Sequence, residues 1–203
     1  MSITNYTELQ ASIANWLHRS DLTAVIPDFI TLAETRMNGT LVSRNMEARV
    51  TLTCTPANRY VSFPSDMMDM KRIAVIDSDP AAILQYKSPD QLMEDNAYIA
   101  ATSRPACFTV VGSTIELAPT PDKAYPLELV YMQRIPPLSV ANPTNWVLNQ
   151  NPNIYLYGAL MSSAPFTQDE DMHPLWEKKY LAAAEVINSV DWYTGSTMRV
   201  KFR

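Results

Sequence analysis

The sequence predicts an α+β fold in which N- and C-terminal segments form a four-helix layer and a small antiparallel β domain is inserted between them. Apolar side chains recur every three or four residues near both ends of the chain, as they do along one face of a helix. In the middle, polar and apolar residues alternate, as in half-buried strands. A single amphipathic helix cannot hide its apolar face in water, so the helices from the two ends are expected to pack together.

Four segments follow from this pattern. We expect an N-terminal helical pair over residues 1–44 and a β-rich inserted domain over residues 45–135. A C-terminal helical pair over residues 136–193 completes the bundle, and an extended basic tail occupies residues 194–203.

The N-terminal pair is predicted from two apolar stripes. Pro27 fits the first position of the second helix, where proline costs no hydrogen bond. Glu34 and Arg36 fall beside the stripe of that helix. The stripe of the first helix comprises Tyr6, Leu9, Ile13, Trp16 and Leu17, and that of the second Phe29, Leu32, Ala33, Met37 and Leu41.

The spacing of apolar residues changes to that of strands in the middle of the chain and returns to that of helices near its end. Strands are expected over residues 49–53, 60–63, 71–76, 104–111, 114–117 and 127–132, with a short helix following Ser88. Helical periodicity returns over residues 152–166 and 169–193. The last helix has the clearest apolar face, which comprises Trp176, Tyr180, Ala183, Ile187 and Val190.

Four runs in the first quarter of the chain resemble the start of tailed-phage head-to-tail adaptor (connector) proteins. These runs are Asp21-Leu22-Thr23, Ile26-Pro27-Asp28-Phe29-Ile30, Leu32-Ala33-Glu34-x-Arg36 and Arg44-Asn45-Met46-Glu47. The similarity continues in kind through the β-rich middle and the closing helical pair, so it covers most of the chain. These are packing residues rather than a chemical signature.

The resemblance implies a structural protein of the virion neck. Its expected partners are the portal protein, tail or nozzle proteins, and copies of itself in a ring, with twelve copies to match the portal. DNA is expected to pass through the ring without specific binding. The alternative is a soluble oligomeric binding or tail-completion factor of a phage or prophage.

Composition excludes several classes of protein. Hydrophobic residues make up 47% of the 203 residues and charged residues 18%, which is typical of an ordered globular chain. The net charge of −5 argues against sequence-independent binding to nucleic acid. The longest apolar runs are far shorter than the roughly 20 residues of a membrane helix, and no signal peptide is apparent, so assembly in the host cytoplasm is expected.

The residues that usually carry chemistry are scattered. His18 and His173 have no ligand at metal-site spacing, and the four glycines form no phosphate-binding loop. Cys54 and Cys107 are expected to be buried thiols. We therefore predict no catalytic, cofactor or metal site and no enzymatic activity; a hydrolase using Asp66 and His173 is the remaining enzymatic alternative.

Two segments are candidates for contacts with partners. In the tail, Arg199, Lys201 and Arg203 alternate with Met198, Val200 and Phe202, so an extended tail has one basic and one apolar face. Without these three cations the chain has 13 basic and 21 acidic residues. We expect the tail to dock on a partner by adding a strand or filling a groove, and the resemblance makes the portal that partner.

The second candidate is a methionine-rich loop. Met67, Met68 and Met70 are flanked by Asp66 and Asp69. Methionine offers flexible apolar surface, so these three residues are a possible inter-subunit contact.

Overall fold

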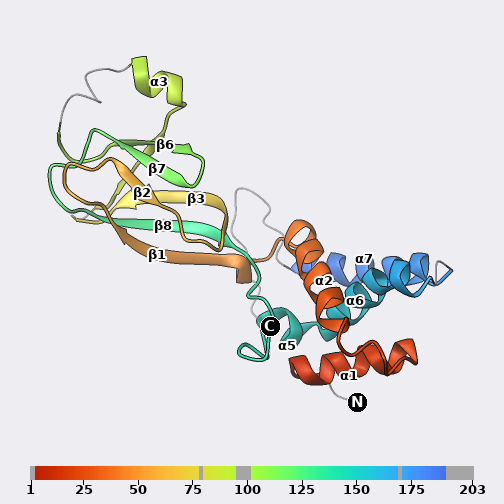
Figure 1. Cartoon of the computed structure of the whole chain (residues 1–203). Coiled ribbons are helices and arrows are strands. Elements are labelled where there is room, and N and C mark those ends of the chain that lie inside the picture. Colours follow the sequence, from red (N-terminus) through yellow and green to blue (C-terminus); the bar gives the residue numbers. More distant parts are fainter. Residues whose placement is uncertain (1–2, 78–79, 95–101, 169–170, 191–203) are drawn as a thin grey trace. The chain divides into compact units, whose positions relative to one another are not determined.

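The computed structural model describes residues 3–77, 80–94, 102–168 and 171–190. It divides into two compact units. The first comprises the described parts of Met1–Met46 and Ile135–Arg203, and the second comprises Glu47–Arg134. The first is helical and the second is built mainly from strands (Figure 1), so the predicted α+β class is confirmed.

The helical unit is organised around one central helix. Its elements are α1 (Tyr6–Leu17), α2 (Ile26–Thr40), the 3₁₀ helix η1 (Arg44–Met46), α5 (Trp146–Gln150), α6 (Pro152–Thr167) and α7 (His173–Val190). Helix α6 packs against α1, α2, α5 and α7. Between Ile154 and Ala164 the side chains of α6 are buried or half-buried, and the predicted pairing of N- and C-terminal helices therefore takes place on this helix.

The close contact of α6 with its neighbours depends on a small residue. Gly158 lies so near α2 that a Cβ atom there would be 3.1 Å from the Cβ of Ala33 and 3.4 Å from the ring of Tyr180. The absence of a side chain lets the two helix backbones approach at this point.

The predicted apolar faces are largely in the core, with two exceptions. Trp176, Tyr180, Ala183 and Ile187 of α7 are buried as expected. Trp16 and Leu32, however, are 51% and 55% exposed. Each lies at the edge of its stripe, where helical periodicity alone does not distinguish a buried position from a boundary position.

A buried polar network fixes the chain segment that returns from the β unit to the helices. Glu34 of α2 accepts hydrogen bonds from the backbone N–H of Leu138 (2.7 Å) and the hydroxyl of Tyr155 (3.1 Å). The side-chain amide of Asn145 donates to the Tyr155 oxygen (2.6 Å) and to the carbonyl of Pro136 (2.8 Å). The sequence placed Glu34 beside the apolar stripe, but the carboxylate is buried because the returning segment covers it.

The β unit contains two four-stranded sheets that share one core. The first sheet has the order β1-β8-β3-β4 and the second β2-β7-β6-β5, and neighbouring strands in these orders are antiparallel except β5 with β6. The strands are β1 (Glu47–Thr53), β2 (Tyr60–Ser62), β3 (Met67–Val75), β4 (Ala82–Ile83), β5 (Gln85–Tyr86), β6 (Cys107–Val111), β7 (Thr114–Ala118) and β8 (Pro126–Gln133). A short helix, α3 (Pro89–Glu94), follows β5.

Alternation along the strands builds this core. Leu127, Leu129 and Tyr131 of β8 are buried while the residues between them are only partly covered. Side chains from both sheets, such as Ile73 and Ile115, belong to the same buried cluster. The strands β4 and β5 were not expected from the sequence, because two residues are too few to show a period.

Candidate interaction surface

The β unit has two strands whose edges are only partly paired. Strand β3 pairs with β8 along its length, but on its other side it pairs with β4 only at Ala74 and Val75. Strand β6 pairs with β7 throughout, whereas its other side pairs with β5 only at Cys107 and Phe108. Within the described residues, therefore, each strand leaves a stretch of edge without a neighbouring strand.

The predicted methionine contact lies on the first of these edges. Met67, Met68 and Met70 were expected in a loop, but they form the first half of β3. The pairing of β3 with β8 shifts register between Met67 and Asp69 and again between Met70 and Arg72. Such bulges interrupt the alternation that marks a strand in sequence, which is why the segment resembled a loop.

The two open edges line a pair of adjoining cavities, which we call the edge groove. One cavity has a volume of about 400 Å³ and the other about 470 Å³, and Met70 and Val110 belong to both. The apolar residues of the edge groove are Phe63, Met67, Met68, Met70, Ile73, Ile83, Leu84, Tyr86, Phe108 and Val110.

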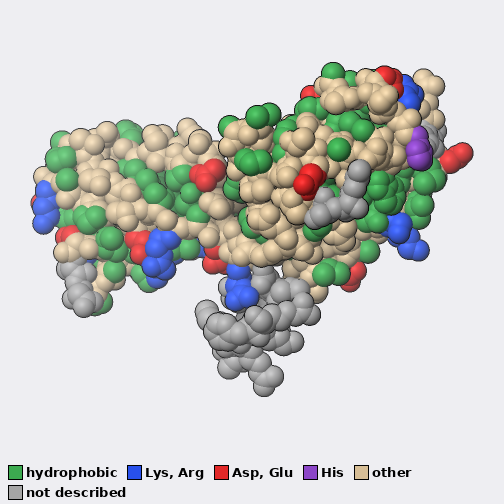
Figure 2. All heavy atoms as spheres, turned by 90° about the horizontal axis from the view of Figure 1, so that it is seen from below, with side chains coloured by type: hydrophobic (Ala, Val, Ile, Leu, Met, Phe, Trp, Pro, Cys, Tyr) green, Lys and Arg blue, Asp and Glu red, His purple; other side chains and the backbone are tan. Residues whose placement is uncertain are grey.

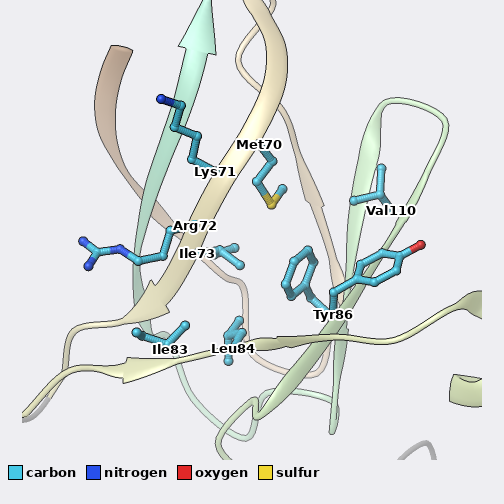
Figure 3. A pocket seen from close by; sticks show the side chains of 9 residues that line it. Met70, Lys71, Arg72, Ile73, Ile83, Leu84, Tyr86 and Val110 are labelled. Carbon is cyan, nitrogen blue, oxygen red and sulfur yellow. The ribbon is translucent and has the colours of Figure 1, made fainter. Parts of the chain in front are cut away.

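Figure 3 shows how the side chains are arranged in the first cavity. Met70 points from β3 toward the side of the groove formed by Tyr86 and Val110, whereas Lys71 and Arg72 point away from them. The ring of Tyr86 packs edge-on against Phe108, with 5.6 Å between ring centroids. Tyr86 and Ile83 are each 62% exposed, so a large part of this apolar surface is accessible in the described structure.

Two of the charged residues that line the groove, Lys71 and Arg72, are paired with partners on the first sheet. Lys71 forms an ion pair with Glu47 of β1, and Arg72 forms one with Glu128 of β8. Glu128 also lies 3.4 Å from Arg49 of β1. These pairs join β3 to β8 and β1, and most of the other residues that line the groove are apolar.

Asp66, the residue before β3, also has a hydrogen-bond partner. The hydroxyl of Tyr131 donates to its carboxylate at 3.2 and 3.3 Å. Burial, and then the nearby Asp66 charge, raise the pKa of Tyr131. The phenol therefore remains a hydrogen-bond donor at neutral pH, and Asp66 serves to fix the end of the strand.

The residues considered for catalysis have local structural roles. His18 ends α1 in a left-handed conformation, and its N–H donates to the carbonyls of α1, as expected for a helix-end residue. His173 begins α7. Within residues 3–77, 80–94, 102–168 and 171–190, no group of three or more His, Cys, Asp or Glu side chains could hold a metal ion.

Comparison with known families identifies the kind of protein. The model of the SU10 adaptor protein family matches residues 4–201, nearly the whole chain. The chain belongs to this family. The resemblance to head-to-tail adaptors is thereby confirmed, and this SU10 adaptor family member is a bacteriophage adaptor, a structural component of the virion. No curated protein matches the chain.

The residues that carry the family resemblance stabilise the helical unit. Glu34 forms the buried network described above, and Arg36 of α2 pairs with Glu177 of α7 at 2.8 Å. The Arg36 guanidinium also lies over the ring of Tyr180, 5.6 Å from its centroid. The motif Leu32-Ala33-Glu34-x-Arg36 therefore joins α2 to α6 and α7.

Two further observations concern the surface of the adaptor and its helices. Figure 2 shows hydrophobic side chains in patches among other side chains and backbone, with charged side chains in small separate groups. None of the helices in the described segments combines the length and the hydrophobicity needed to cross a membrane.

Of the two predicted contact segments, the structure describes only the methionine-rich one. It places Met67, Met68 and Met70 together on one strand edge. The predicted docking residues Met198, Arg199, Val200, Lys201, Phe202 and Arg203 lie outside the described residues. The sequence did not indicate that Ile83, Tyr86 and Val110 line a groove. Ile83 and Tyr86 lie on two-residue strands, which show no period, and the exposure of Val110 depends on which distant strand pairs with β6.

Proposed function

We propose that this adaptor forms a ring that docks below the portal and joins the capsid to the tail, with its lumen forming part of the DNA channel. The observation that carries the proposal is the family match over residues 4–201. The adaptor role requires a surface for copies and partners, and the open, apolar edge groove supports such contacts.

A ring is the assembly that best suits a chain with such a surface. Contacts between unlike patches on neighbouring copies repeat head to tail, and they close into a ring when the rotation closes. The proposed copy number is twelve, to match the portal, and Met67, Met68 and Met70 belong to the proposed contact between copies. The proposed location is the virion neck, after assembly in the host cytoplasm.

The charge of the chain supports passage of DNA without binding. Acidic residues number 21 and basic residues 16, so the protein as a whole repels phosphate. A negative lumen would keep DNA from adhering during packaging and ejection. A ring structure with a strongly basic channel would overturn this part of the proposal.

Assembly on isolated portal rings tests the proposal. Purified adaptor mixed with portal should sediment with it and add a ring of density below it in electron micrographs. Met68→Glu places a charge on the 42% exposed edge residue and should weaken the assembly. Val140→Glu is the matched control, because Val140 is 91% exposed in the helical unit.

The outcomes separate the proposal from its alternative. Portal rings that remain bare in the presence of a defined small oligomer would overturn the ring adaptor and favour the tail-completion factor. If both glutamate variants assemble as well as the original protein, the methionine edge is not a subunit contact.

A further inference from the structure

The edge groove has the properties of a site for an added strand. An open strand edge presents backbone N–H and C=O groups that pair readily with another extended segment. Here two such edges, on β3 and β6, line the same apolar groove. Strand addition uses the edge for backbone hydrogen bonds and neighbouring pockets for alternate side chains.

We infer that the edge groove receives residues 198–203 of a neighbouring copy as an added strand. The inference rests on the proposed ring, and it assigns the tail to a neighbouring subunit instead of directly to the portal. In an extended conformation, Met198, Val200 and Phe202 lie on one face and fit the apolar lining. The three alternating cations lie on the opposite face, toward solvent.

The lengths of the two segments agree. The open part of β3 runs from Met67 to Arg72, opposite Val130–Gln133 of β8, because the carbonyl of Ile73 already accepts a hydrogen bond from the N–H of Leu84. At roughly 3.3 Å per residue, the six tail residues span about 20 Å, enough to follow the whole of this edge.

The charges near the groove also favour a cationic strand. Asp69 is an exposed residue of the groove wall, and Lys71 and Arg72 are already paired with Glu47 and Glu128. Because Asp69 is exposed, it attracts the solvent-facing Arg199 and Lys201 of an incoming strand, and the charges of Lys71 and Arg72 are already offset by their acidic partners.

Exchange between neighbours fits the geometry of a ring. Each copy offers one groove and one tail, which is a contact between unlike surfaces. Such a contact repeats identically around a closed ring and leaves no groove empty.

Disulfide trapping in the full-length chain tests the inference. Phe202→Cys is introduced into one pool of protein and Val110→Cys into a second, and the pools are mixed before assembly. Both native cysteines are buried, so the new thiols are the accessible ones. The control pool has Val140→Cys; Val140 is 91% exposed against 36% for Val110, so random collisions favour the control.

Strand exchange predicts that Phe202→Cys cross-links to Val110→Cys at least about tenfold faster than to Val140→Cys, because docking raises the effective thiol concentration toward millimolar. The chain with both Phe202→Cys and Val110→Cys should form a ladder of linked chains on a denaturing gel. Equal rates for the two acceptors, or linkage within single chains only, would overturn the inference.

A parallel measurement keeps the two proposals distinct. Rings that form on portal without the Val110 cross-link would overturn strand exchange and leave the adaptor function intact. Cross-linked chains that never assemble on portal would retain strand exchange and overturn the ring adaptor.

Discussion

A single buried carboxylate determines how the helical unit holds its returning segment. Glu34 accepts two hydrogen bonds in a buried position, from Leu138 and Tyr155. Burial raises the pKa of Glu34, and the two hydrogen bonds oppose this shift. Burying the charged carboxylate is therefore unfavourable, and the hydrogen bonds from Leu138 and Tyr155 offset this cost.

Substitutions at Glu34 separate the hydrogen bonds from the charge. Glu34→Gln keeps an acceptor oxygen, so its free energy of unfolding at neutral pH should stay within about 1 kcal/mol of the original value. Glu34→Ala leaves the N–H of Leu138 and the hydroxyl of Tyr155 without this acceptor and should cost about 2–3 kcal/mol. Chemical denaturation of both variants measures the difference.

The pH dependence supplies the control. A carboxyl whose pKa is raised in the folded state contributes stability that is fully present below its unfolded value of 4.5. That stability is lost as the pH rises through the folded-state pKa. The original protein should therefore lose stability relative to Glu34→Gln as the pH rises above 4.5. A difference that is constant with pH would show that Glu34 does not titrate in this way.

At the scale of elements, the two helical glycines have opposite environments. Gly39 of α2 has nothing within 4 Å of the position that a Cβ would occupy. Gly158 of α6 faces Ala33 and Tyr180 at 3.1 and 3.4 Å. Helix propensity favours alanine at both positions, so the difference between them measures the packing of α6 alone.

Gly39→Ala should raise the free energy of unfolding by about 0.5–1 kcal/mol, because alanine restricts the unfolded chain and adds no clash. Gly158→Ala should be less stable than Gly39→Ala by at least about 1 kcal/mol, because α2 and α7 must move to admit a methyl group. Thermal and urea unfolding of the two variants test this. Equal gains would mean that the contact of α2 with α6 is not tight.

At the scale of the whole molecule, assembly is expected to depend on a segment that adds little to the fold of one chain. Deletion of residues 198–203 should leave the unfolding temperature of the adaptor within about 1 °C, because terminal residues usually contribute little to stability. The same deletion should weaken ring formation, and with it attachment to portal, because a ring binds through many copies at once.

Sizing chromatography measures ring formation, and co-sedimentation with portal measures attachment. Replacement of Arg199 and Lys201 by glutamine, with Met198, Val200 and Phe202 kept, is the matched comparison and should have the smaller effect. Attachment that is unchanged by the deletion would remove the tail from both the ring and the portal contact.

The sequence by itself determined the long helices of this adaptor, most of its strands and the family to which it belongs, but not β4, β5 or the first half of β3. Periodicity is a local property, so the faces of α7 and the alternation in β8 could be read from neighbouring residues. The family resemblance likewise rested on short runs such as Leu32-Ala33-Glu34-x-Arg36.

Only the tertiary structure decided the burial of Glu34 and the existence of the edge groove. Glu34 is covered by Leu138, which is 104 positions away in the chain, and Met70 lies on a groove that Tyr86 and Val110 complete. A strand edge is open or closed according to which distant strands pair with it, and the bulges in β3 hide even its local period. These properties depend on contacts between distant segments, which no local pattern contains.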